Sequence, residues 1–120
     1  MQRANGPVQS WNVETEGALT TVAIRRRHQP NDHFRISPNS YAGGTKFPER
    51  SRAGRVYVLF GRCKFVNDEY VWDLIAPCYA DLPAGGFTFS VPDDYDVMLV
   101  KVWELPSELW PPPEERRTIG

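Results

Sequence analysis

Apolar and polar residues alternate along much of this chain with a period of two, which is typical of β-strands rather than of helices. The stretch 97–105 shows the pattern most fully, because both of its alternating sets are apolar apart from Lys101 and Glu104. We therefore expect a strand that is covered on both faces. Similar runs, separated by turn-forming residues, lie at 19–25, 55–60, 63–66, 70–75 and 87–91. Short strands with turn signals roughly every 8 to 12 residues predict an all-β sandwich or barrel.

Three parts of the chain lack this alternation. Residues 27–55 hold many turn formers and both histidines, so we expect a long irregular segment that forms the variable wall of any site. The first residues are polar, and the last ones contain three consecutive prolines. We accordingly divide the chain into an irregular N-terminal arm at 1–18, a single barrel at 19–105 and a proline-rich tail at 106–120.

Composition excludes several classes of protein. A chain of 120 residues fits one domain, and 41% hydrophobic residues exclude disorder throughout. Its apolar runs fall short of the roughly 20 residues that span a bilayer, and its first ten residues lack the apolar part of a secretory signal. We therefore expect no membrane association and a cytoplasmic protein. The two cysteines, Cys63 and Cys78, are expected to be buried thiols rather than a disulfide. Trp11 and Trp110 are expected to lie outside the barrel.

Two segments contain glycine turns of a recognisable kind. They are Arg-Val-Tyr-Val-Leu-Phe-Gly-Arg-Cys-Lys-Phe at 55–65 and Asp-Leu-Pro-Ala-Gly-Gly-Phe-Thr-Phe at 81–89. In these segments, and in the order of strands around them, the chain resembles the cupin superfamily of small double-stranded β-helix (jelly-roll) barrels. The resemblance implies a single cupin-like barrel over residues 19–105. Barrels of this family often dimerise by sheet packing or by exchange of terminal strands, so the resemblance also implies a homodimer.

The metal ligands of the cupin family are missing from the matching positions. Counted back from Gly61, the family's carboxylate falls on Gly54, and its two histidines fall on 47 and 49 or on 48 and 50, where this chain has no histidine. The histidine of the second motif is Thr88. A first-row metal in a cupin is held by imidazoles and a carboxylate. We therefore expect no metal, no other cofactor and none of the family's oxygenase chemistry.

Charge is divided unevenly along the sequence. Residues 1–66 carry eleven Lys and Arg against four Asp and Glu, a net +7, whereas residues 67–120 carry three against eleven, a net −8. With a net charge of −1 for the whole chain, we expect no nucleic-acid binding. The two halves are better interpreted as complementary surfaces within one fold or across a dimer. A basic rim at 27–62 remains as the place where an anionic ligand could enter.

Three functional hypotheses follow. The first is a metal-independent barrel that binds a small polar or anionic ligand and needs no enzymatic activity. Its expected lining residues are Arg50, Arg52, Tyr57, Trp72, Thr88 and Trp103. The second is a protein-interaction module of the immunity or regulatory type. The third and weakest is an isomerase or lyase: the sugar epimerases of the family use a histidine and aspartate pair with a tyrosine, and the matching set here would be His33, Asp32 and Tyr41.

Overall fold

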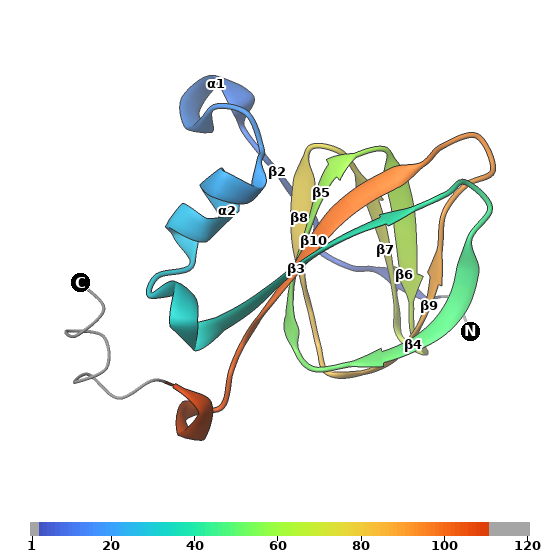
Figure 1. Ribbon diagram of the computed structural model, residues 1–120. Coiled ribbons are helices and arrows are strands. Elements are labelled where there is room, and N and C mark those ends of the chain that lie inside the picture. Colours follow the sequence, from blue (N-terminus) through green and yellow to red (C-terminus); the bar gives the residue numbers. More distant parts are fainter. Residues whose placement is uncertain (1–2, 111–120) are drawn as a thin grey trace.

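The computed structural model describes residues 3–110, and it contains two five-stranded sheets packed face to face (Figure 1). Sheet I has the order β1 (Ala4–Asn5), β7 (Tyr70–Ile75), β6 (Arg62–Val66), β9 (Gly85–Ser90), β4 (Lys46–Ser51). Sheet II has the order β2 (Gln9–Ser10), β8 (Cys78–Leu82), β5 (Gly54–Phe60), β10 (Val97–Glu104), β3 (Phe34–Tyr41). From β3 onward every connection crosses between the sheets except the β6–β7 hairpin. The predicted all-β jelly-roll barrel is confirmed.

The main core lies between the two sheets. It is formed by the side chains that alternate inward from each strand, such as Val56 and Val58 of β5 and Phe87 and Phe89 of β9. A second core covers the outer face of sheet II. Strand β10 contributes to both, with Leu99 in the first and Val100 and Val102 in the second, as its two apolar faces predict. Sheet II is therefore a middle layer, and sheet I has one face open to solvent.

The predicted strand at 19–25 is wrong, because this stretch forms helix α2 (Thr21–Arg27). The side chain of Thr20 caps the first turn by accepting from the backbone N–H of Ala23, and three arginines lie in the last turn, where the helix dipole favours cations. Val22 is 59% exposed while Ile24 is fully buried, so one face of the helix packs on sheet II. Figure 1 shows α2 and the short helix α1 (Val13–Glu16) beside the barrel.

The predicted irregular segment at 27–55 is also mostly wrong. After a single 3-10 turn, η1 (Asn31–His33), it forms β3 and β4, each of which is one of the two edge strands of its sheet. Both strands contain a proline, Pro38 and Pro48. An edge strand is bonded on one side only, so it tolerates a residue without an N–H group. Proline therefore marks sheet edges here rather than loops.

The expected irregular N-terminal arm carries structure of its own. β1 pairs with β7 and β2 pairs with β8, so this segment extends both sheets. Trp11 is buried in the second core at 5% exposure, where its ring meets Tyr57 edge to face, and it does not lie outside the barrel as expected. After β10 the chain forms η2 (Ser107–Leu109), and Trp110 stacks on His33 at 3.9 Å between ring centroids. Residues 111–120 of the predicted tail lie outside the described residues.

No helix within residues 3–110 has the length and apolar character needed to cross a membrane.

Candidate functional site

A hollow of about 420 Å³ opens between the sheets where their edge strands β3 and β4 face each other. We call it the inter-sheet groove. It is lined by Ser37, Asn39, Tyr41, Glu49, Arg50, Ser51, Arg52, Lys101 and Trp103. Most of these side chains point inward because the alternation of their strands places apolar neighbours, such as Phe47 and Leu99, in the core on the same side. The groove is thus an opening into the barrel interior.

Its floor carries an ion pair between Lys101 of β10 and Glu49 of β4. Both side chains are largely buried, at 15% and 18% exposure, and the pair joins sheet II to sheet I. The Lys101 ammonium also lies 5.9 Å from the centre of the Phe65 ring, at the edge of the core. Burial lowers the pKa of Lys101. The second carboxylate oxygen of Glu49 is buried and has no hydrogen-bond partner among residues 3–110.

Two arginines and a tryptophan form the upper walls. Arg50 and Arg52 make no ion pair with any part of the chain that the structure describes, and Trp103 faces them from β10. The groove therefore holds three cationic side chains and one carboxylate, and that carboxylate already has a cationic partner. A positive potential in a partly enclosed hollow attracts anions more strongly than the same charges would in bulk water.

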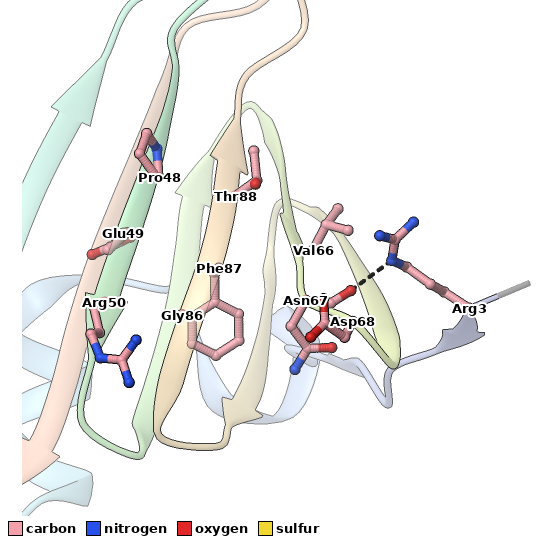
Figure 2. Close-up of a pocket in the computed structure, with 10 residues that line it drawn as sticks. All are labelled: Arg3, Pro48, Glu49, Arg50, Val66, Asn67, Asp68, Gly86, Phe87 and Thr88. Carbon is pink, nitrogen blue, oxygen red and sulfur yellow. Dashed lines mark hydrogen bonds between the residues drawn. The ribbon is translucent and has the colours of Figure 1, made fainter. Parts of the chain in front are cut away.

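Three of the predicted lining residues meet in this groove: Arg50, Arg52 and Trp103. The other three lie elsewhere. Tyr57 is fully buried in the second core, on the opposite face of sheet II. Trp72 is buried in the main core, 5.8 Å from the ring of Phe87. Thr88 lies on the open face of sheet I, in a separate hollow of about 440 Å³ that Figure 2 shows.

The set proposed for acid–base catalysis is not assembled. His33 stacks on Trp110, with its Nε2 3.8 Å from Asp32 Oδ1, just before β3 begins. Tyr41 ends the same strand and packs against Phe47 and Phe89. Eight residues of extended chain separate His33 from Tyr41, or roughly 26 Å. The structure therefore gives no support to a catalytic group built from these three side chains.

Two residues of the groove, Lys101 and Glu49, were not predicted to line it, although each has a signal in the sequence. Lys101 is the only charged member of the inward-facing set of 97–105, and a charge on an otherwise apolar strand face indicates a partner or a cavity. Glu49 occupies one of the two alternative histidine positions of the family motif, and the structure places it inward together with residue 47.

Solved structures share this arrangement of sheets. A cupin 2 conserved barrel domain protein from Salinispora arenicola matches with a TM-score of 0.54 and 17% identity over 73% of each chain. A cupin superfamily protein from Desulfitobacterium hafniense matches with a TM-score of 0.52 and 17% identity, over 88% of this chain and 84% of that one. The protein has the cupin fold. No family model and no curated protein matches its sequence. The likeness to these solved structures therefore establishes the fold alone.

The cupin fold implies a metal inside the barrel, and the side chains of this protein do not fit one. Residues 3–110 contain no group of three His, Cys, Asp or Glu side chains that could hold a metal ion. The interior carboxylate, Glu49, is paired with the Lys101 ammonium. Thr88, at the second motif's histidine position, faces away from the barrel interior, because its neighbours Phe87 and Phe89 fill the core. No chemical step through a metal is derived for this groove.

Proposed function

We propose that this cupin-fold protein binds a small polar anion in the inter-sheet groove and does so without a metal. The observation that supports the proposal is the excess of positive charge in a hollow of about 420 Å³, where Lys101, Arg50 and Arg52 face one paired carboxylate. Metabolite sites are commonly clefts of roughly 300–1,000 Å³ with a few convergent polar groups. The groove has this size and this composition.

Each group of side chains has a distinct part in the proposed binding. The guanidinium groups of Arg50 and Arg52 offer paired donors that suit a carboxylate or phosphate, and Lys101 supplies a point charge at the floor. Trp103 and Tyr41 provide flat apolar walls. Hydroxyl and amide groups from Ser37, Asn39 and Ser51 can orient the polar remainder of the ligand. Binding of this kind requires no bond to be made or broken.

The proposal is tested with pairs of small ligands that differ only in charge. Titration calorimetry would compare carboxylates with the corresponding neutral amides, first on the native protein and then on Arg52→Gln. We expect a set of carboxylates to bind and their amides not to. Arg52→Gln should weaken binding about tenfold or more, because a hydrogen bond to a charged group contributes roughly 1.5–3 kcal/mol.

A matched control is Arg26→Gln, which removes the same charge from the exposed surface of α2 and should leave the affinity unchanged. Equal binding of amides and carboxylates, or an Arg52→Gln variant with native affinity, would refute the proposal. Elemental analysis gives a separate check of metal independence, and one equivalent of iron, manganese or zinc per chain would contradict it.

A further inference from the structure

On the open face of sheet I, strand β9 carries the smallest outward-facing residues. Because Phe87 and Phe89 point into the core, the residues between and beside them, Gly86, Thr88 and Ser90, point outward. These three side chains are small. Strand β9 therefore forms the floor of a shallow channel on the outer face of sheet I, about four residues or roughly 13 Å long. Strand β4 separates this channel from the inter-sheet groove.

The strands on either side of β9 form the walls of this channel. Lys46 of β4 and Lys64 of β6 both lie beside Ser90, and Pro48 and Val66 both lie beside Thr88. Further along, Arg50 lies beside Gly86. Since neighbouring strands are about 4.8 Å apart, the two walls are about 10 Å apart at their backbones. This width suits one extended polypeptide chain lying along β9.

A second arginine closes the end of the channel near Gly86. Arg3 is held there because its Nε donates a hydrogen bond to the backbone oxygen of Asn67 at 2.6 Å, in the turn between β6 and β7. Figure 2 shows Arg3 and Arg50 on opposite sides of the hollow, with Gly86 and Thr88 between them. The hollow at this end measures about 440 Å³.

The channel is basic at both ends. Arg3 and Arg50 flank one end, Lys46 and Lys64 flank the other, and none of the four forms an ion pair within residues 3–110. Arg62, on the same strand as Lys64, shows the contrast, because its guanidinium is paired with Asp73. Three acidic side chains lie near this charge: Asp68 and Glu49 line the hollow, and Asp73 lies across from Lys64 on β7. Glu49 is already paired with Lys101, and Asp73 with Arg62.

We propose that this channel binds an extended acidic peptide segment of a partner protein. Two cationic ends about 13 Å apart match carboxylates at positions i and i+4 of an extended strand, which lie on the same face at this spacing. The hydroxyl of Thr88 lies between the two ends, and that of Ser90 lies at the lysine end, both within reach of a peptide backbone. Single-stranded nucleic acid would require exposed aromatic rings for stacking, and the channel floor has none.

The test uses fluorescence anisotropy with three labelled peptides of equal length. One carries Glu at i and i+4, one carries two adjacent Glu residues, and one has Gln in place of Glu. We expect the first peptide to bind at least severalfold more tightly than the second, and the third not to bind. Backbone amide shifts in NMR spectra of the peptide complex should centre on Thr88 and Ser90.

Variants locate the binding on the surface. Arg3→Glu with Lys64→Glu should weaken binding at least tenfold, whereas Arg25→Glu with Arg26→Glu makes the same change in net charge on α2 and should leave binding nearly unchanged. Thr88→Trp fills the channel without changing charge and should also weaken binding, so the proposal stays testable if the charge variant fails to fold. Arg50 is left intact because it borders both hollows.

Several results would overturn this inference. They are equal binding of the Glu and Gln peptides, native affinity in Thr88→Trp, amide shifts that centre on the inter-sheet groove, or displacement of the peptide by a single-stranded oligonucleotide of lower total charge. The site shares Arg50 with the inter-sheet groove, but the variants in each test leave Arg50 intact and the two tests use different ligands. Failure of this inference would therefore leave the small-anion proposal untouched, and the reverse also holds.

Discussion

At the scale of single residues, Gly61 has little freedom to change. It joins β5 of sheet II to β6 of sheet I with φ at +81°, a conformation that side chains with a Cβ rarely adopt. An added Cβ would also lie 1.9 Å from the backbone oxygen of Asp96. Two independent constraints therefore require glycine at position 61, where the sequence predicts a turn: the positive φ and the lack of space for a Cβ.

Substitution of Gly61 by Ala should lower the free energy of unfolding by about 3 kcal/mol, because strain at φ and a backbone collision add together. Gly17→Ala is the control, since Gly17 has a similar φ of +76° but has no atom within 4 Å of the added Cβ. Its cost should be smaller, because only the backbone strain of its conformation opposes the added Cβ. Urea denaturation of both variants measures the difference, and equal losses would mean that the contact with Asp96 is relieved by a small backbone shift.

The two cysteines are free and buried, as the sequence predicts. Burial raises the pKa of the Cys63 thiol to about 12 and that of Cys78 to about 11. Because the thiolate is the reactive form, both should resist a thiol-specific reagent near neutral pH while the protein is folded. We expect two equivalents to react only after unfolding in urea. Rapid labelling of either thiol in the native protein would contradict this.

At the scale of elements, the strands that the sequence predicted correctly are those with the strongest alternation: β5, β6, β7, β9 and β10. Helix α2 was missed because seven residues are too few to separate the two periodicities, and its signals were the Thr20 cap and the three arginines in its last turn. Strand β3 was missed because Pro38 was taken to indicate a loop. In both cases the same residues fit more than one kind of element, and only the place of the segment in the fold decides between them.

The same limit explains the candidate site. A strand covered on both faces gives no sign of which face lines the barrel, so Tyr57 was assigned to the interior when it belongs to the opposite core. Arg50, Arg52 and Trp103 line one hollow, and their part in ligand binding stays a prediction. The Lys101–Glu49 pair could not be derived, because the two residues are far apart in sequence and meet only when the sheets pack.

The contact between α2 and sheet II should make stability depend on pH. His28 Nε2 lies 2.9 Å from the Tyr57 hydroxyl, and that oxygen also accepts from Nη1 of Arg55 at 3.4 Å. A neutral His28 can then accept a hydrogen bond from the hydroxyl of Tyr57. Burial lowers the pKa of His28 below its ordinary 6.5, and the charges of Arg55 and Arg27 lower it further against a smaller opposing effect of Asp81.

The unfolded protein therefore binds a proton at His28 more readily than the folded protein does. Because of this difference, the free energy of unfolding rises with pH between the pKa of His28 in the folded protein and its ordinary value of 6.5. The same stability is lost as the pH falls through that interval. We expect the urea concentration at the unfolding midpoint to decrease when the pH is lowered from about 8 to about 5.5. The decrease should be larger in the native protein than in His28→Gln. The carboxylates and His33 are common to both proteins, so parallel curves would show that His28 contributes nothing.

At the scale of the whole molecule, the uneven charge along the sequence becomes a set of ion pairs between the two halves of the chain. The pairs Arg55–Asp81, Arg62–Asp73 and Lys101–Glu49 each join the half before residue 67 to the half after it. This supports the interpretation of the two halves as complementary surfaces of one fold. Cations of the first half that find no partner line the groove and the channel. The homodimer implied by the family resemblance stays a prediction.

Pro38 and Pro48 have a consequence for how copies of this protein can meet. Each interrupts the outermost strand of a sheet, and the missing N–H leaves a gap in the row of donors that an incoming strand would need. Continuous hydrogen-bonded growth from one barrel to the next, the route to fibrous aggregates, is thereby obstructed along both of these borders. Any strand-to-strand association should therefore use the opposite borders, at the two-residue strands β1 and β2, or give way to contact through the broad faces of the molecule.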